Sequence, residues 1–324
     1  MATSLIGRLV KTIMIEQART TVQSGAVFVD RSNLGILKLT GATRFDLIHR
    51  MSTQDLRNMK SGEGRATVLT TDIARIIDRL ILYAATDKAY MLTSENLSDP
   101  IARYLMRYVF FNDDIQLEDL SKDTAIFGVY GSQAGALLEK VGFPETDLPL
   151  HHWREVTLDG LTLYLHSTDP IAGQGYLVMC NTAQQATLTE KLSAAGIAQI
   201  DEAAFEYLRI EAGLPRFGHE LSEDYIPLET GLWNDVSFAK GCYIGQEIIA
   251  RMESRGKLAK KLVRFSAESP LTTGNITSNG KKAGTLTSVA NSENGSVALG
   301  YVRTKILESA ESKLYQGDVL LSTI

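Results

Sequence analysis

The sequence predicts an α+β protein made of two similar halves and a small β-rich domain at the end. Its 324 residues exceed the size of one typical hydrophobic core, so more than one domain is expected. Strand-like and helix-like apolar patterns follow the order β, β, α, β, β, β, α over residues 26–109, and parts of that order recur after residue 125. After Gly256, short apolar segments separated by Gly, Asn and Ser turns predict a small β-barrel or sandwich.

In the first half we expect two short strands between Ala26 and Leu39, joined by a turn. The later elements of this half are a helix after Gly41, strands over residues 66–71, 76–84 and 89–92, and a helix over residues 98–109. Asp72 and Asp78 flank the turn between two of these strands. His49 lies on the first helix, and we interpret it as a partly buried helix residue and not as a ligand.

The second half repeats part of this order. Residues 127–133, FGVYGSQ, give a short strand, a glycine and a helix, as the segment up to Gly41 does. Residues 175–180, followed by a helix, match residues 89–92 and their helix. Two matched pairs in one order indicate a duplication, with an antiparallel sheet and helices on one face in each half. We therefore divide the chain into residues 1–120, 121–256 and 257–324.

Composition restricts the partners. Hydrophobic residues make up 44% of the chain and charged residues 22%, which is ordinary for a globular protein. A net charge of −5 gives no overall attraction to nucleic acid or to an anionic membrane, so we expect neither as a direct partner. No apolar run approaches the ~20 residues of a membrane-spanning helix.

Two cysteines, Cys180 and Cys242, lie far apart in the sequence. This use of cysteine suits a reducing compartment, so we expect the protein in the cytoplasm. Two thiols are too few for an iron–sulfur cluster ligated by this chain alone, and we predict no metal site. Cys180 falls on a strand of the second half, where we interpret it as a core residue.

The N-terminus has two open interpretations. Arg8, Lys11 and Arg19, with Ser and Thr nearby, faintly resemble a transit peptide. Leu5, Leu9 and Ile13 recur at helical spacing, and an amphipathic first helix that belongs to the fold is the more economical interpretation.

A helix is expected after Asp201, which can cap its N-terminus, and Gly213 closes it. Glu211 lies one turn from the end, where the helix dipole disfavours an acid, so a partner should account for it. One alternative is a surface ion pair with Arg209 or Arg216. The other is a bound group that offers the carboxylate two N–H donors.

The segment KGCYIGQE at residues 240–247 is not explained by local structure alone. Gly241 and Gly245 permit a tight turn and a close approach to the backbone. The apolar spacing that follows predicts a short helix from about Gly245 or Gln246. Cys242 would then lie just before a helix N-terminus.

That position favours the thiolate form of Cys242. Lys240 and the helix N-terminus both carry positive potential, whereas Glu247 opposes them. We therefore predict a reactive thiol. The alternative is a buried small residue in a glycine-rich turn.

KGCYIGQE resembles the signature of the YgfZ family, folate-binding proteins of iron–sulfur cluster assembly and repair. Their fold is related to the aminomethyltransferase, or T-protein, of glycine cleavage. The resemblance extends to LRIEAG at residues 208–213 and PLE at residues 227–229, and more weakly to nearly the whole chain. It implies that the two halves form a folate-binding region for tetrahydrofolate or a derivative. It also implies iron–sulfur client enzymes or cluster-assembly proteins as partners, with tRNA modification enzymes among the clients.

The resemblance also assigns roles to residues. Cys242 and Lys240 would carry a redox or cluster-related step, within a motif completed by Gly241, Tyr243, Gly245, Gln246 and Glu247. The folate contacts would be Glu211, Arg209, Asp78 and Trp233. Glu211 would accept two adjacent N–H groups of the pterin ring in a planar, charge-assisted pair. Trp233 lies in an irregular loop, where ring stacking and core packing are both open.

Two other functions stay open beside this one. A true aminomethyltransferase needs a carboxylate poised at the folate nitrogens. The transferases carry an aspartate pair where this chain has Asp78 and Arg79, and they lack a counterpart of Cys242 in a KGC motif, so the resemblance favours the assembly role. The third function is a non-catalytic assembly factor with a vestigial folate pocket.

Overall fold

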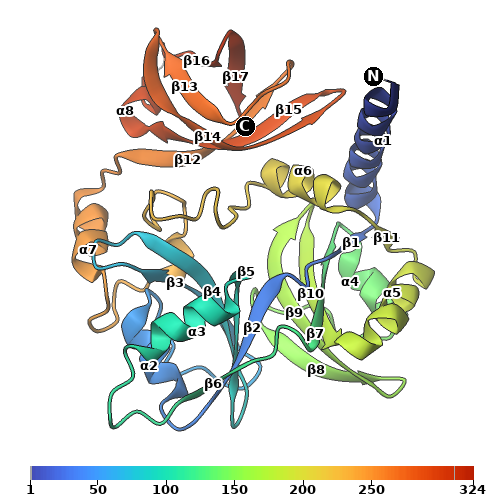
Figure 1. Cartoon of the computed structure of the whole chain (residues 1–324), viewed down its shortest axis with the longest axis vertical. Helices are drawn as coiled ribbons and strands as arrows, with labels where there is room; N and C mark the ends of the chain where they lie inside the picture. The colour runs from blue at the N-terminus through green and yellow to red at the C-terminus, as the bar shows by residue number, and fades with distance from the viewer. Residues whose placement is uncertain (1, 310) are drawn as a thin grey trace.

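The computed structural model describes residues 2–309 and 311–324, with side chains described from residue 13 onward except those of Arg255 and residue 310. Figure 1 shows two sheets side by side, with a barrel above them. Most strands of each sheet come from one of the two halves of the chain.

The first sheet has the order β3-β4-β5-β2-β6, and all its neighbouring strands are antiparallel. Its elements are β2 (Leu34–Thr40), α2 (Arg44–Met51), β3 (Gly64–Thr70), β4 (Ile76–Ala84), β5 (Ala89–Glu95), α3 (Ser98–Met106) and β6 (Gln116–Asp119). Alternate strand residues such as Leu37 and Leu39 point to one face, where they pack against Leu47 of α2 and Ile101 of α3. The helices therefore cover one face of the sheet, as predicted.

The second sheet has the order β11-β1-β7-β10-β9-β8. Its elements are β1 (Val27–Asp30), β7 (Thr124–Tyr130), α4 (Ala134–Val141), β8 (Trp153–Leu158), β9 (Leu161–Ile171), β10 (Gln174–Asn181), the 3₁₀ turn η1 (Thr182–Gln184), α5 (Gln185–Ala194) and β11 (Ala198–Gln199). Cys180 is buried in the core between this sheet and its helices, as predicted. Sequence reasoning assigned no elements to residues 150–171, which form β8 and β9.

The two repeats, which begin at β1 and at β6, exchange their first strands. β1 precedes β2 in the chain but pairs with β7 of the second sheet, where Val27 lies opposite Tyr130. β6 precedes β7 but pairs with β2 of the first sheet, where Gln116 lies opposite Thr40. The two strands expected between residues 26 and 39 therefore form and enter different sheets. This exchange ties the halves together.

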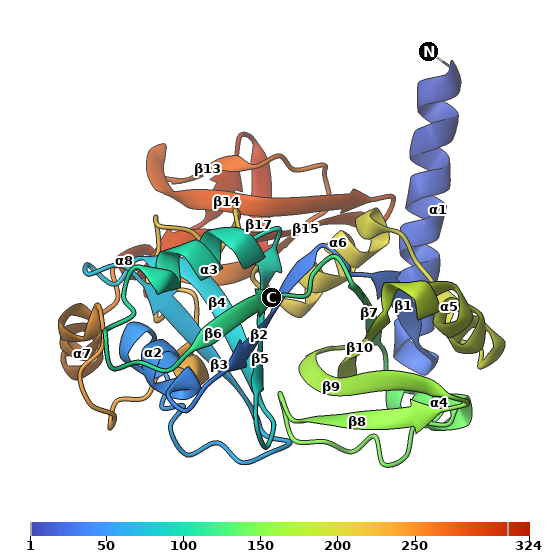
Figure 2. The ribbon, with the colours of Figure 1, turned by 60° about the horizontal axis from the view of Figure 1, so that its bottom comes forward.

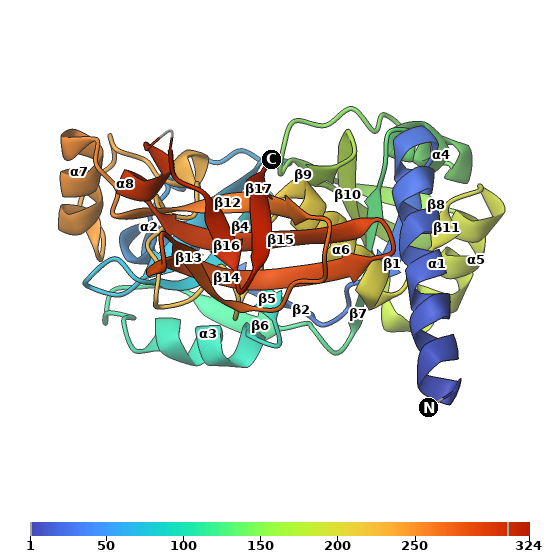
Figure 3. The ribbon, with the colours of Figure 1, turned by 90° about the horizontal axis from the view of Figure 1, so that it is seen from above.

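The remaining elements lie over the two sheets. They are α1 (Ala2–Ser24), α6 (Glu202–Ala212), the 3₁₀ turn η2 (Trp233–Asp235), α7 (Gln246–Arg255), α8 (Thr304–Leu307) and the barrel strands β12 (Lys260–Ala267), β13 (Gly274–Ser278), β14 (Lys281–Ser292), β15 (Gly295–Arg303), β16 (Leu314–Gln316) and β17 (Val319–Thr323). β12 pairs with both β15 and β17, which closes the predicted C-terminal barrel. Figure 3 shows the barrel strands crossing above the two sheets.

α6 lies where the second sheet, α1 and the barrel meet. The Asp201 side chain caps it by accepting from Ala204 N at 2.8 Å, and it ends at Gly213 in a left-handed conformation, both as predicted. Its buried Phe205 and Leu208 share a core with Ile15 of α1 and Leu299 of β15. α6 therefore connects the second sheet, α1 and the barrel (Figure 2).

The predicted N-terminal helix is present as α1. Ile15, Ala18 and Val22 form its buried face, while Ile13 is 47% exposed. The Leu5 and Leu9 side chains, which also predicted this helix, lie outside the described set. Across residues 2–309 and 311–324, no helix combines the length and the apolar character needed to cross a membrane.

Candidate functional site

The motif turn, residues 240–245, packs against the first half. Gly245 has φ +84°, and a Cβ there would come within 2.8 Å of Thr70 Oγ1 and of Thr71 O. Thr70 Oγ1 also donates to Ile244 O at 2.8 Å. Only glycine combines this conformation with this close approach, and α7 begins at the next residue, Gln246, as predicted.

Tyr243 anchors the turn in a hydrophobic core. Its side chain packs with Ile226, Leu228 and Ile249, and burial raises the pKa of its hydroxyl to about 12. The tyrosine therefore stays neutral at physiological pH, and its ring fixes the position of the residue before it.

Lys240 is buried and fully bonded. Its Nζ donates to three carbonyl oxygens at the end of α2: to His49 at 2.5 Å, to Ser52 at 2.7 Å and to Gln54 at 2.8 Å. An ammonium group has three N–H donors, so these bonds use all of them. Burial lowers the pKa of Lys240 to about 8. Lys240 holds the turn against α2, and its catalytic role stays a prediction.

Cys242 is exposed, in contrast to its neighbours Lys240 and Tyr243. Nothing in the described chain lies within 4 Å of the position that a Cβ on Gly241 would take. Glu247 is also exposed and forms an ion pair of 3.1 Å with Arg251. The motif therefore exposes the Cys242 thiol to solvent, while Lys240 before it and Tyr243 after it are held in place. The other thiol, Cys180, is buried, and burial raises its pKa to about 11.

A cavity of about 180 Å³ lies between the two halves, under α6. We call it the arginine-lined cavity. Its polar wall consists of Arg31, Arg79, Thr168, Asp169, Arg209 and Arg216. Its apolar wall consists of Leu34, Ile81, Leu92, Tyr130, Leu177, Phe205, Leu214, Pro215 and Leu232. These residues come from both sheets, from α6 and from the segment after it.

Arg209, predicted to contact the ligand, lines this cavity and is 2% exposed. Its guanidinium donates to Glu220 at 2.7 Å, to Ser288 Oγ at 2.5 Å and to the Glu206 carboxylate. The partners lie on α6, on the following segment and on the barrel. Hydrogen bonds to these three parts of the chain thus fix the Arg209 side chain in place.

Arg79 lies between two carboxylates. It donates to Asp169 and to Asp235 at 2.6 Å each. Asp78 points elsewhere: it is fully buried, its carboxylate accepts from the backbone N–H groups of Arg79 and Ser94, and burial raises its pKa to about 7. Asp78 is not among the cavity-lining residues, so its place at the folate stays a prediction.

Glu211 is also not among the residues that line the arginine-lined cavity. Its carboxylate faces α1, where Arg19 donates to it from Nη2 at 2.7 Å and from Nε at 3.1 Å. The two ion pairs weighed from the sequence, with Arg209 or Arg216, do not form. The partner that accounts for an acid at this end of α6 is Arg19, and contact between Glu211 and a pterin stays a prediction.

Trp233, the remaining predicted contact, lies on η2 and is 42% exposed. Its ring is 6.2 Å from that of Phe238. The neighbouring Leu232 lines the cavity, while Trp233 does not. Residues 232–240 therefore run from the cavity wall to the motif turn.

Sequence reasoning missed Arg31 and Asp169 in this site. Arg31 carried a signal, because it comes soon after the apolar residues 26–29, whereas Asp169 follows the polar residues 166–168 and carried none. Asp169 lies in β9, and Arg31 directly follows β1. Both belong to the second sheet and pair with residues of the first, Arg31 with Glu95 of β5 and Asp169 with Arg79 of β4. These pairs depend on how the two sheets come together, which no local pattern shows.

Comparisons with known proteins agree with this architecture. Residues 9–240 match the family model of the GCVT N-terminal domain, and residues 260–324 match that of the CAF17 C-terminal β-barrel domain. A chloroplastic putative transferase of Arabidopsis thaliana is 30% identical over 292 residues, which cover 89% of this chain and 68% of the relative. An aminomethyltransferase of Halalkalibacterium halodurans is 26% identical over 257 residues, covering 77% and 69%.

The crystal structure of the glycine cleavage system aminomethyltransferase T from Bartonella henselae has the same fold. It superposes with a TM-score of 0.83 at 19% identity, covering 96% of this chain and 88% of that one. The predicted α+β class, with antiparallel sheets and a C-terminal barrel, is thereby confirmed. The chain belongs to the GCVT N-terminal domain family, in the form that carries a CAF17-type β-barrel at its C-terminal end.

Proposed function

We propose that this chain is a folate-binding protein that supports iron–sulfur cluster assembly or repair through the thiol of Cys242. The observation that carries the proposal is the motif turn, where Lys240, Tyr243 and Gly245 are fixed and Cys242 is exposed. Residues that only filled a turn would not need three separate anchors around one free thiol. Iron–sulfur enzymes or assembly proteins, as the YgfZ resemblance implies, are the partners we propose for this thiol.

The arginine-lined cavity fits the ring of a folate. Phe205, Tyr130 and Leu177 offer apolar contact to a flat ring, and Asp169 and the arginines offer an acceptor and donors for its polar edge. Arg31 Nη1 is buried and makes no hydrogen bond in the described chain, its ion-pair partner Glu202 lying at 3.6 Å, and we propose that it donates to a ring carbonyl. At about 180 Å³ the cavity takes the bicyclic ring, while the glutamyl tail extends outward.

Two features of the geometry support ranking aminomethyl transfer below the assembly role. The transfer requires a carboxylate free to act on the folate nitrogens. Asp169 in the cavity is held by Arg79, and Asp78 is buried against two backbone N–H groups. We therefore rank the transferase second, although relatives bear that name.

The folate site is tested by titration calorimetry of the purified full chain with tetrahydrofolate and with its methylene and formyl forms. We expect saturable binding of one molecule per chain. If no form binds, the folate part of the proposal fails, and a purely structural assembly factor becomes the better description.

Aminomethyl transfer is tested separately. We expect no folate-dependent ammonia release from an aminomethylated carrier protein. If the wild-type chain releases ammonia and Asp78→Asn abolishes the release, the transferase assignment replaces ours.

A further inference from the structure

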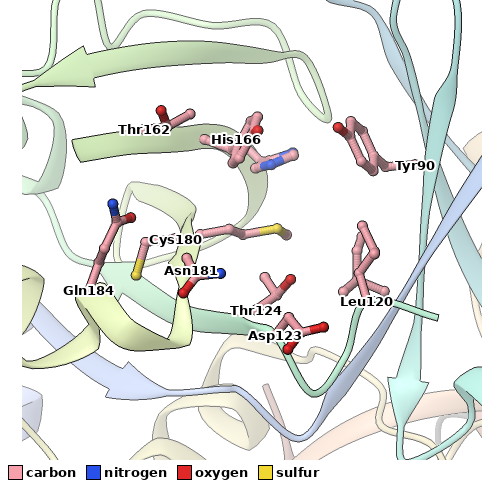
Figure 4. A pocket seen from close by; sticks show the side chains of 12 residues that line it. Tyr90, Leu120, Asp123, Thr124, Thr162, His166, Cys180, Asn181 and Gln184 are labelled. Atoms are coloured by element: carbon pink, nitrogen blue, oxygen red, sulfur yellow. The ribbon is translucent and has the colours of Figure 1, made fainter. Parts of the chain in front are cut away.

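A second cavity, of about 410 Å³, lies along the same contact between the two sheets (Figure 4). Residues two positions apart on a strand share one face of a sheet. On β2, Leu34 lines the arginine-lined cavity and Ile36 lines the second cavity. On β10, Leu177 lines the arginine-lined cavity and Met179 lines the second one. The two cavities are therefore successive openings along one contact surface, and they belong to separate sites.

The two cavities differ in charge. Among the described residues that line the second cavity there is no arginine or lysine, and its one charged side chain is Asp123. The first cavity has four arginines. A phosphate or carboxylate would therefore lose its hydration in the second cavity without gaining a cation, which disfavours anionic ligands.

His166 supplies a built polar group in the second cavity. It is 2% exposed, and within the described parts of the chain neither of its ring nitrogens has a hydrogen-bond partner. Burial lowers its pKa to about 3, so at neutral pH the ring carries one donor and one acceptor. Figure 4 shows the imidazole of His166 and the hydroxyl of Tyr90 directed toward the same open space. A buried polar group without a partner carries a desolvation cost that a matching ligand removes.

The rest of the lining is aromatic and apolar. Tyr90 and Tyr164 lie with ring centroids 6.1 Å apart, and Met179 adds a thioether that packs well against aromatic faces. We propose that the second cavity binds an uncharged planar nitrogen heterocycle of about the size of a purine nucleoside, with His166 pairing to a ring nitrogen or N–H. The volume of the cavity lies within the range of small-molecule sites. This site is additional to the proposed folate site and does not depend on it.

The chain contains its own reporter for this site. The Trp153 ring stacks on His166 at 5.7 Å and 13°, and Trp153 and Trp233 are the two tryptophans of the chain. In a Trp233→Phe background, tryptophan fluorescence therefore reports on the neighbourhood of His166. We expect adenosine to change this fluorescence saturably. Adenosine monophosphate, which has the same ring and added negative charge, should bind at least tenfold more weakly.

Two variants locate the effect. His166→Phe keeps a flat ring and removes both nitrogens, so adenosine affinity should fall at least tenfold, while the tetrahydrofolate titration should not change. Tyr90→Phe removes a single hydroxyl and should weaken adenosine binding several-fold. This second variant tests the proposal even if His166→Phe folds poorly. Arg216→Gln, in the other cavity, should leave adenosine binding unchanged.

The proposal is overturned by any of three results. The first is the absence of a saturable signal with adenosine up to about 1 mM, which would mean that the cavity holds only water. The second is equal affinity for adenosine and its monophosphate. The third is adenosine binding that both His166→Phe and Tyr90→Phe leave intact.

Discussion

At the scale of single residues, the structure gives Lys240 a structural role that the sequence did not predict. The sequence predicts a lysine that activates the neighbouring thiol, while the structure shows an ammonium group bonded to three carbonyl oxygens at the end of α2. A cation near a helix C-terminus is stabilising, and the carbonyls are buried. Lys240 thus holds the turn in place, because its long side chain reaches α2, which the sequence does not place beside it. Activation of the Cys242 thiol by Lys240 stays a prediction.

Lys240→Met should accordingly reduce stability. Buried acceptors left without a donor cost roughly 1–3 kcal/mol, so the free energy of unfolding in urea should fall by about that amount. Lys257 is exposed and provides a matched control. Lys257→Met should change the free energy of unfolding by less than about 0.5 kcal/mol. Equal effects of the two substitutions would contradict the anchoring role.

Glu211 and Arg216 give opposite expectations for folate binding. Arg216 lines the arginine-lined cavity, whereas Glu211 pairs with Arg19 outside it. Arg216→Gln should weaken tetrahydrofolate binding roughly tenfold, as expected for loss of one charge-assisted hydrogen bond, and Glu211→Gln should leave it unchanged. Calorimetry on both variants, after thermal melts confirm that they fold, decides between them. The reverse result would restore the contact between Glu211 and the pterin that the resemblance implies.

His166 predicts a specific acid sensitivity. Its pKa is about 3 in the folded chain against 6.5 for a free histidine, so below pH 6.5 the unfolded chain binds the proton and the folded chain does not. Stability is therefore lost as the pH falls from 6.5 toward 3, by about 2–3 kcal/mol at pH 4.5. His166→Phe removes this contribution, so the variant should lose less stability than the wild type between pH 7 and 4.5, measured by urea unfolding. Parallel losses in both proteins would show that His166 is not buried as a neutral ring.

At the scale of elements, the strand exchange explains which glycines are required. Gly131 directly follows β7 and has φ +137°, and a Cβ there would lie 2.4 Å from Gly25 O, just before β1. This contact exists because β1 crosses into the second sheet. The sequence shows that a glycine follows the strand, but the reason for it lies in a segment more than a hundred residues away.

Gly131→Ala should therefore be more destabilising than Gly160→Ala. Both glycines have positive φ, but nothing in the described chain lies within 4 Å of a Cβ on Gly160. The clash at Gly131 should add roughly 1–3 kcal/mol to the conformational cost that both share. Urea unfolding of the two variants measures the difference. Equal losses would mean that the contact of β1 with the end of β7 is looser than described.

At the scale of the whole molecule, local sequence patterns were enough to predict the fold class and the residues at which several elements begin or end. The cap at Asp201, the start of α7 and the closing barrel all follow from short-range spacing. The partners of buried charges do not follow in this way. Arg79 meets Asp169 from the other half and Asp235 from the segment after α6, so its ion pairs depend on how three distant parts of the chain assemble.

The proposed site likewise has one part that the sequence shows and one part that only the assembled fold shows. The motif at residues 240–247 could be recognised from the sequence because its residues are contiguous. The arginine-lined cavity could not, since its wall is gathered from both sheets and from α6, and two of its charged residues lay in segments without a recognisable motif. The whole molecule thus places a contiguous motif and a dispersed cavity at the two ends of residues 232–240.

The central claim is that the exposed thiol of Cys242 carries the function. Its most direct test is complementation of cells that lack the protein, with iron–sulfur enzyme activity as the measurement and Cys242→Ala and Cys180→Ala as the two variants. Cys242 contributes little to the core, so Cys242→Ala should fold and accumulate normally and yet fail to restore enzyme activity, whereas Cys180→Ala should restore it if it folds. Full complementation by Cys242→Ala would contradict the account and leave KGCYIGQE as a structural turn.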